Sequence, residues 1–236
     1  MNRLFWSLAS ASALVLIASC TSDEIGNSKD VNPDAVYFDY RVWAEEGNGD
    51  VTIKLQYRMG GKNGTTLILN EPSKVAIDGE ELKVDSAKFT GAYYEVQKPF
   101  ANFSGNHTIS FTDLNKKEYK EDFDFNPFTL DPDVPATITR GDIVFTFKGL
   151  EPTDYITVLM TDTSFASTDI NELDTIRNGQ LTIKADKLST LVNGPINLQV
   201  YREIEKPLKN TTKEGGKLYM SYGLKREFML SDAGTK

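Results

Sequence analysis

The sequence predicts an all-β protein in which two antiparallel β-sandwiches follow one another along the chain. Residues 51–59 alternate between apolar and polar side chains without a break, the pattern of a strand with one buried face. Turn-forming residues recur roughly every ten residues, as in β-sandwiches. The proline-rich segment 126–135 separates two series of about seven expected strands each, because proline cannot donate to a sheet ladder.

Residues 1–19 are expected to form a signal peptide. Arg3 supplies a short positive region, and the following residues 4–17 are apolar and uncharged. This stretch is shorter than the roughly 20 apolar residues that a transmembrane helix needs. The sequence therefore predicts export rather than a membrane-spanning segment.

Ile17, Ala18 and Ser19 precede Cys20, which is the one cysteine of the chain. An aliphatic residue, two small residues and a cysteine resemble the lipobox of bacterial lipoproteins. The resemblance implies that signal peptidase II recognises these residues and cuts before Cys20, which then carries a diacylglyceryl thioether. Two or more acyl chains, such as palmitate, hold a protein on a membrane almost permanently. The alternative is a plain secretory signal with an incidental cysteine.

Residues 20–34 are expected to be a flexible tether, because 21–33 are polar and contain glycine, asparagine, serine and proline. Fully extended, these residues reach about 45 Å at roughly 3.5 Å each. The acidic pair Asp23 and Glu24 resembles the surface-export signals of Bacteroidota-type lipoproteins, although a merely solvated tether explains it equally well. The expected location is the outer membrane, facing either the periplasm or the cell surface.

The expected domains are a first sandwich at 35–126, a linker at 127–135, a second sandwich at 136–231 and a disordered tail at 232–236. Residues 164–177 are expected to form a loop, and 184–191 a short helix. In the first domain the expected strands are 36–44, 51–59, 66–69, 74–77, 81–84, 92–96, 107–112 and 119–125. In the second they are 137–139, 142–147, 155–161, 180–183, 196–201, 217–222 and 225–230. The arrangement resembles tandem immunoglobulin-like domains of the bacterial, disulfide-free kind.

Composition excludes several classes of function. The formal net charge is −8, and loss of Arg3 with the signal peptide makes the mature chain −9, so nucleic acid is not an expected partner. A single cysteine and a single histidine, His107, leave too few ligands for a structural zinc site and one base for a catalytic triad. We therefore assign no catalytic residue, no metal ligand and no cofactor, and do not expect an enzyme, although a hydrolase with a carboxylate pair carries no short motif.

The densest aromatic stretch is 36–43. On a strand, Tyr37, Asp39, Arg41 and Trp43 share one face, opposite a face of apolar and aromatic residues. If the apolar face is buried, Tyr37 and Trp43 stand outside beside an acid and Arg41, which suits stacking on sugar rings. The alternative, which the sequence favours, is that Trp43 packs under a loop or against the second domain.

Two further patterns concern O-glycosylation and surface charge. Ser86 and Thr175 each follow an aspartate in a three-residue pattern that resembles the O-glycosylation motif of Bacteroidota-type exported proteins. The acids between Glu118 and Asp124 are interpreted as solvated charge, and 121–124 as a charged, protected sheet edge.

The leading hypothesis is a lipid-anchored, non-catalytic binding or assembly module at the outer membrane, with a glycan or an envelope protein as partner. One alternative is a cell-surface glycan-handling accessory protein or a glycoside hydrolase that uses a carboxylate pair. Another is a pilus or surface-layer component, since some bacterial pilins are lipoproteins of two β-sandwiches.

Overall fold

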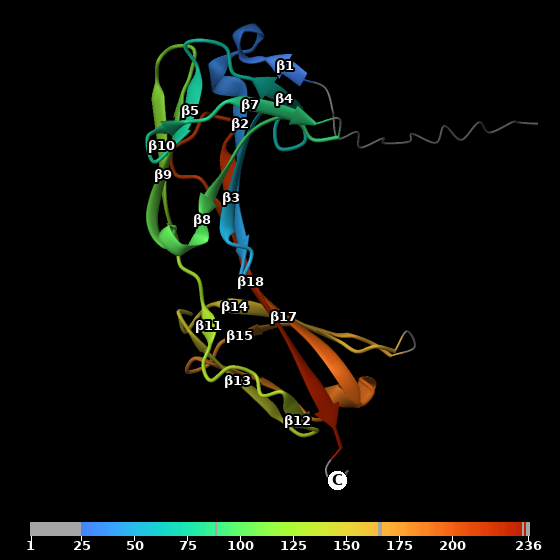
Figure 1. The fold of residues 1–236 in the computed structure, drawn as a ribbon. Coiled ribbons are helices and arrows are strands. Elements are labelled where there is room, and N and C mark those ends of the chain that lie inside the picture. The colour runs from blue at the N-terminus through green and yellow to red at the C-terminus, as the bar shows by residue number, and fades with distance from the viewer. Residues whose placement is uncertain (1–24, 88, 165–166, 233, 235–236) are drawn as a thin grey trace, which may run out of the picture.

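The computed structural model of the chain describes residues 25–87, 89–164, 167–232 and 234 (Figure 1). In these residues the regular elements are β-strands and short 3-10 helices, and none forms an α-helix. Two sandwiches lie end to end, with the first half of the chain at the top of Figure 1 and most of the second half below. The predicted all-β fold class with two sandwiches is confirmed.

The elements follow the expected order closely. In the first half the strands are β1 (Ile25–Asn27), β2 (Val36–Glu45), β3 (Asp50–Met59), β4 (Thr65–Ile68), β5 (Lys74–Ile77), β6 (Glu80–Glu81), β7 (Val84–Ala87), β8 (Gly91–Pro99), β9 (Gly105–Thr112) and β10 (Glu118–Phe125). In the second they are β11 (Thr129–Leu130), β12 (Thr137–Thr139), β13 (Ile143–Lys148), β14 (Tyr155–Thr161), β15 (Ile170–Thr175), β16 (Gln180–Ile183), β17 (Gly194–Pro207) and β18 (Gly216–Ser231). The 3-10 helices are η1 (Ser28–Asp30), η2 (Pro33–Ala35), η3 (Phe100–Asn102) and η4 (Lys187–Thr190).

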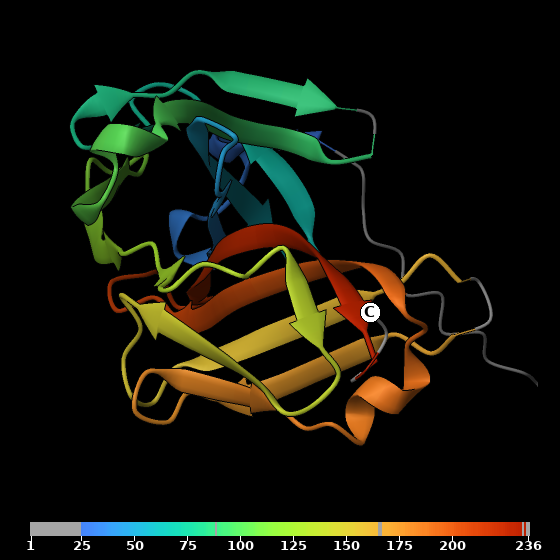
Figure 2. The ribbon, with the colours of Figure 1, turned by 60° about the horizontal axis from the view of Figure 1, so that its bottom comes forward.

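One long sheet runs through both sandwiches. Its main strand order is β1-β4-β3-β2-β18-β17-β14-β15, with β8 and β7 added beside β3 and with β12 beside β18. The sheets β10-β9-β5-β6 and β11-β13-β16 complete the first and second sandwich, respectively. Apolar residues of all three sheets form one continuous core. In Figure 2 the neighbouring strands β17, in orange, and β18, in red, lie side by side across the second sandwich.

Alternating side chains explain why these strands form layers. On β2 the residues Val36, Phe38, Tyr40 and Val42 are at most 3% exposed, whereas Arg41 between them is exposed. The ring of Phe38 lies 5.1 Å from the ring of Phe111 on β9, so the two layers meet through aromatic edges. The period of two predicted from the sequence therefore places one face of each strand in the core.

The expected division into separate domains differs from the structure, because the C-terminal hairpin belongs to both sandwiches. The expected strands 217–222 and 225–230 form one strand, β18, which passes through Gly223 without a break. From Gly216 to Gly223 this strand pairs in parallel with β2, and from Lys217 to Leu230 it pairs antiparallel with β17. Its apolar residues enter both cores in turn, since Leu218 and Phe228 are both buried. A strand this long outreaches one sandwich, so the boundaries 35–126 and 136–231 do not delimit independent units.

The expected flexible tether is wrong for residues 25–34. Strand β1 pairs in parallel with β4, and Ser28 is buried. The backbone N–H of Asn70 donates to Ser28 Oγ at 2.8 Å, and the N–H of Lys29 donates to Asn70 Oδ1 at 3.2 Å. These reciprocal bonds hold the segment on the first sandwich, where composition alone predicts a free polar chain.

Other expectations also change. The linker 127–135 contributes the buried Phe128 and strand β11, which pairs with β13. The expected loop 164–177 contains β15, and the expected helix 184–191 contracts to the single turn η4. The expected tail begins with Asp232, which accepts hydrogen bonds from Arg140 and Asn193.

Glu121, expected in solvent, is buried and accepts the backbone N–H of Lys209 at 2.9 Å, so it fastens the β17–β18 turn to the first sandwich.

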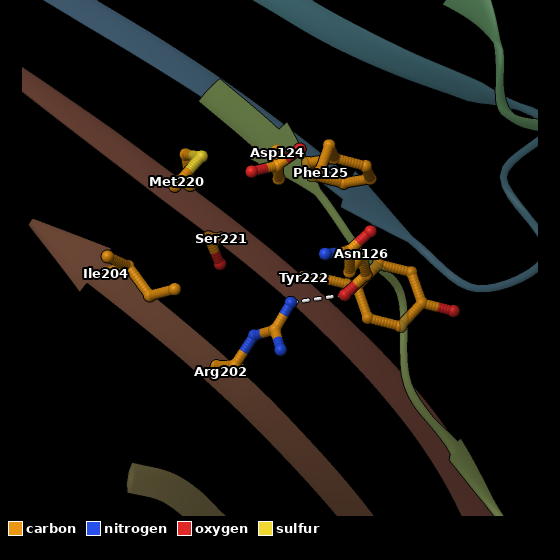
Figure 3. Close-up of a pocket in the computed structure, with 8 residues that line it drawn as sticks. All are labelled: Asp124, Phe125, Asn126, Arg202, Ile204, Met220, Ser221 and Tyr222. Carbon is orange, nitrogen blue, oxygen red and sulfur yellow. Dashed lines mark hydrogen bonds between the residues drawn. The ribbon is translucent and has the colours of Figure 1, made fainter. Parts of the chain in front are cut away.

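An aromatic cluster fills the junction between the sandwiches. The ring of Tyr222 on β18 stacks on Phe100 at 5.6 Å and meets Phe128 at 5.2 Å and Phe125 at 6.3 Å. Beside this cluster, Arg202 donates to the backbone oxygen of Asn126, as the dashed line in Figure 3 marks.

Arg202 also connects the two halves of the chain. It donates to Asp154 Oδ2 at 3.1 Å, so one guanidinium binds the end of the first half and the turn before β14. The crevice beside it has room for about 10 Å³, which suits at most a single water molecule. The junction is therefore a packed joint rather than a ligand cavity.

Candidate functional site

The side of the long sheet that points away from the core carries polar and aromatic residues, and we call it the outer face; two of its residues, Asp39 and Gln56, are covered by their neighbours and are 4% and 5% exposed. It follows from the alternation of the strands, because residues between the buried ones must point outward. Across the first sandwich it comprises Glu95 and Gln97 on β8, Thr52, Lys54, Gln56 and Arg58 on β3, Tyr37, Asp39, Arg41 and Trp43 on β2, Lys217, Tyr219 and Ser221 on β18, and Glu203 and Glu205 on β17.

Tyr37, Arg41 and Trp43 all lie on this outer face, as the alternation of β2 predicts. They do not form one site. Tyr37 is six residues from Trp43 along the strand, a separation of about 20 Å at 3.3 Å per residue. Arg41 is engaged by Asp39, with Nη2 3.3 Å from Oδ2. Partial burial raises the pKa of Tyr37, and Asp39 raises it further.

Trp43 lines an open hollow on the outer face, which we call the Trp43 hollow. Its volume is about 400 Å³, and it is lined by Trp43, Ala44, Glu45, Asn48, Asp50, Thr52 and Gln97. Trp43 is partly exposed there instead of lying buried under a loop or the second sandwich. Within the described part of the chain, no group accepts a hydrogen bond from its indole N–H. The hollow therefore presents an aromatic surface with an unused donor.

Strand pairing places the polar groups around the indole. Thr52 lies directly opposite Trp43 on β3, and Gln97 lies opposite Thr52 on β8. The turn between β2 and β3 supplies Asn48 and brings the chain back to Asp50. A hydroxyl, two carboxamides and a carboxylate thus surround one aromatic ring, and together they offer both donors and acceptors.

The charge of the Trp43 hollow is acidic. Its lining includes Glu45 and Asp50 and no basic residue. Glu45 Oε2 accepts from Lys225 Nζ at 2.8 Å, a bond that raises the pKa of this lysine. Because Oε2 is occupied by an ammonium group, Glu45 is poorly placed to protonate a substrate oxygen. The arrangement suits an uncharged polar ligand better than an anion or a hydrolysed bond.

A second hollow, of about 270 Å³, lies beside His107. The two ring nitrogens of His107 are 2.7 Å from Asp78 Oδ2 and 2.9 Å from the backbone oxygen of Phe103. The imidazole also stacks on Phe103, with ring centroids 3.7 Å apart. With both nitrogens engaged, His107 is not available as a general base. In the residues that the structure covers, no group of three or more His, Cys, Asp or Glu side chains could hold a metal ion.

The remaining predicted site residues are distributed differently. Ile17, Ala18, Ser19 and Cys20 lie outside the described residues. No described helix has the length and apolar character needed to cross a membrane.

Ser86 lies on the exposed strand β7, and Thr175 lies at the end of β15, where it is partly exposed. In each case the preceding aspartate accepts the backbone N–H of the motif residue at 2.7 Å. The two motifs therefore share one local geometry on two strands far apart in the chain.

Sequence reasoning missed most of the Trp43 hollow. Asn48 and Asp50 have the composition of a turn, and Gln97 comes from a strand whose partner only the sheet order identifies. Tyr219 was also missed, although the alternation of 217–222 places it on an outward face. It reaches the neighbourhood of Arg41 through the parallel pairing of β18 with β2, which no local pattern signals.

No family model matches the chain, and no curated protein matches its sequence. Solved structures resemble it weakly. A tetra-tandem repeat from the extending region of a large adhesion protein is 13% identical, covering 82% of this chain and 49% of its own, with a TM-score of 0.27; this chain thus spans about half of that structure. The fibronectin(III)-like modules of Clostridium thermocellum CbhA are 9% identical, with 85% and 96% coverage and a TM-score of 0.24.

A third structure is SGBP-B of the Bacteroides ovatus mixed-linkage glucan utilization locus, in complex with a mixed-linkage heptasaccharide. It is 9% identical, covers 88% of this chain and 66% of its own, and has a TM-score of 0.19. At these identities and scores, none of the three structures indicates what this chain binds.

Proposed function

We propose that this protein is a non-catalytic glycan-binding module and that the Trp43 hollow is its binding site. The observation that carries the proposal is the partly exposed indole of Trp43, surrounded by Asn48, Asp50, Thr52 and Gln97 in an open hollow. A sugar ring has an apolar face and a rim of hydroxyl groups. The indole covers the apolar face, and the amides, hydroxyl and carboxylate bind the rim.

Trp43 is expected to dominate the affinity. Buried aromatic anchors supply most of the binding energy at such sites, and their removal typically costs about 2 kcal/mol or more. This corresponds to a loss of roughly 30-fold in Kd. A ligand held mainly by rim hydrogen bonds would lose much less.

The test is a glycan array probed with the mature chain carrying Cys20→Ser, followed by titration of the best neutral oligosaccharide. The chain has two tryptophans, Trp6 and Trp43, and Trp6 lies in the expected signal peptide, so fluorescence of the mature protein reports on Trp43 alone. Trp43→Ala should weaken binding at least tenfold by calorimetry. Tyr37→Ala is the matched control, because it removes an aromatic of the same strand and face about 20 Å away. Equal affinity of the Trp43→Ala and Tyr37→Ala variants would contradict the proposal.

Hydrolysis is the competing function, since Glu45 and Asp50 both line the hollow. Incubation of the bound oligosaccharide with the protein is expected to release no reducing ends. If reducing ends are released and Asp50→Asn abolishes their release, the protein is a glycoside hydrolase rather than a binding module.

The location that we propose is the outer membrane, with the lipid on Cys20. Five residue steps separate Cys20 from the start of β1, a reach of at most about 18 Å. Strand β1 and its partner β4 lie beside Arg58 and Met59, at the end of the first sandwich opposite the junction (Figure 1). An anchored molecule would therefore keep its first sandwich near the membrane and direct its second sandwich away.

Membrane pelleting tests the anchor. Cys20→Ser should move the full-length protein from the membrane fraction to the soluble fraction, and unchanged pelleting would argue against lipidation. Protease treatment of intact cells separates a surface orientation from a periplasmic one.

Ser86 and Thr175 are proposed as O-glycosylation sites on the basis of their exposure and the shared aspartate geometry. Intact-mass measurement of the native protein should show a glycan increment that Ser86→Ala and Thr175→Ala remove. A mass equal to that of the unmodified lipoprotein would exclude both sites.

A further inference from the structure

We propose that the glycan is a neutral oligosaccharide, which extends from the Trp43 hollow across β18 onto a second contact patch around Tyr201. This inference rests on the proposed function and specifies the length and charge of the ligand. We call the second set of residues, Tyr155, Asn197, Gln199 and Tyr201, the Tyr201 patch.

The Trp43 hollow and the Tyr201 patch are neighbours on the outer face. Glu45, which lines the hollow, pairs with Gly223 on β18, and Gly223 pairs with Tyr201 on β17. Tyr201 is two strand spacings and two residues away from Trp43, a straight-line separation of about 12 Å. The two aromatic rings thus come from opposite ends of the sequence and from the two halves of one surface.

Gly223 lets the ring of Tyr201 lie close to the sheet. A Cβ atom at Gly223 would be 2.4 Å from Tyr201 Cδ1 and 2.5 Å from Cε1. These distances are far shorter than any van der Waals contact, so every other residue at position 223 forces the ring to move. One side of the Tyr201 ring therefore lies against the backbone of Gly223, while Tyr201 stays partly exposed on the outer face.

A chain of polar side chains continues from this ring along β17. The hydroxyl of Tyr201 donates to Gln199 Oε1 at 2.6 Å, and Gln199 Nε2 donates to Asn197 Oδ1 at 3.0 Å. These bonds fix the two amides in one orientation, and each amide retains further donors or acceptors for hydroxyl groups of a ligand. A preordered polar row loses less side-chain entropy on binding than a mobile one.

Tyr155 extends the aromatic part of the patch. Thr157 on β14 pairs with Tyr201, and Tyr155 is two residues from Thr157 on the same face. Its side chain is 59% exposed. Single exposed apolar residues are ordinary, but here a second ring adjoins a fixed ring and a row of amides.

The charges along the path favour an uncharged ligand. The basic residue between the hollow and the patch, Lys225, is already paired with Glu45 at 2.8 Å. Glu203 and Glu227 flank the path on β17 and β18. Along this part of the described surface an acidic polysaccharide would meet a lysine whose charge Glu45 already balances, and it would be repelled by the carboxylates of Glu203 and Glu227.

Length is the feature that an experiment can test. The straight-line separation from Trp43 to Asn197 is about 22 Å, which is wider than a single sugar ring. A short ligand would occupy the Trp43 hollow alone, and only a longer chain would reach the Tyr201 patch. The two regions should therefore respond differently to ligand length.

The experiment is calorimetric titration of the mature chain carrying Cys20→Ser with a di- to hexasaccharide series of the best neutral array hit. The affinity of the parent protein is expected to rise at least tenfold from the disaccharide to the hexasaccharide. Tyr201→Ala should remove most of this gain while changing disaccharide binding by less than twofold. Tyr201→Phe, which keeps the ring, is the matched control and should retain most of the gain. Trp43→Ala should weaken every member of the series.

Gln199→Ala provides an independent variant, because its side chain lies outside the core. It should lower hexasaccharide affinity about threefold to fivefold without affecting the disaccharide. A uronic acid oligomer of equal length should bind at least tenfold more weakly than the neutral one. Circular dichroism confirms that each variant is folded.

The outcomes separate the two proposals. If affinity does not depend on length, or if Tyr201→Ala and Gln199→Ala change nothing while Trp43→Ala still weakens binding, the extended ligand is wrong and the proposed function stands. Equal affinity for the uronic acid oligomer overturns the neutral assignment. If Trp43→Ala has no effect, or if no neutral glycan binds, the proposed function fails and this inference fails with it.

Discussion

Replacing Tyr222 by alanine perturbs the joint on which both sandwiches depend. Tyr222 is 3% exposed, and its ring contacts Phe100, Phe125 and Phe128. These partners come from η3, from the end of β10 and from the segment between the halves. At Tyr222 the strand is paired on both sides, with Ala44 on β2 and with Arg202 on β17.

The expected cost follows from burial. Truncating a buried large aromatic residue to alanine costs about 3–5 kcal/mol, through lost transfer free energy and the cavity left behind. For a chain of this size, 1 kcal/mol shifts the Tm by about 2–4 °C, so the predicted fall is roughly 6–20 °C. The control is Tyr222→Phe, which keeps the ring and should cost less than about 1.5 kcal/mol.

Urea unfolding is monitored by two signals in the same samples. Fluorescence of Trp43 reports on the first sandwich, and far-UV circular dichroism reports on both. In the parent protein the two transitions should coincide, because β17 and β18 belong to both sandwiches. A cost below about 1 kcal/mol for Tyr222→Ala, or separate transitions in the parent protein, would refute a shared core at the junction.

Three further outcomes are expected. Removal of residues 194–236 should leave a chain without a cooperative urea transition, since both sandwiches lose strands; a sharp transition would contradict this. Arg202→Ala should destabilise the protein by about 1.5–3 kcal/mol, because it leaves Asp154 without its charged partner, and Arg202→Lys should recover only part of this loss; a change below 0.5 kcal/mol in the urea midpoint analysis would speak against the clamp. Asp162 has a lowered pKa, mainly because Ser167 donates to it, so its contribution is complete above the ordinary aspartate pKa of about 3.9 and is lost as pH falls through the lowered value. Asp162→Asn should therefore reduce the acid-side loss of stability, measured as the urea midpoint between pH 5 and pH 3, and an unchanged pH profile would exclude this role.

The candidate site was only partly accessible from sequence. Alternation along β2 places Trp43 on the face opposite Phe38, and this requires nothing more than the period of a strand. What surrounds Trp43 depends on which strands pair, and in what register. Gln97 and Tyr201 are 54 and 158 residues away in the sequence, respectively, and local patterning carries no information about such partners.

The N-terminal segment shows a different limit. Residues 25–34 are polar and contain turn-forming residues, so composition predicts a free tether. They fold because Ser28 accepts the backbone N–H of Asn70, because the side chain of Asn70 accepts the N–H of Lys29, and because β4 offers an open edge to β1. A complementary partner elsewhere in the chain overrides a weak local preference.

The sequence by itself determined the all-β class, most strand positions and the inward and outward faces, because these depend on side-chain alternation between near neighbours. Only the tertiary structure decided that one sheet joins both sandwiches. The hairpin of β17 and β18 inserts the end of the chain beside β2, a pairing between residues almost 180 positions apart. Hydrogen bonds between strands are made by the backbone, which is the same in every residue, so strand order is set by how the whole set of apolar faces is buried together. The outer face that we propose as a glycan site is a product of that pairing.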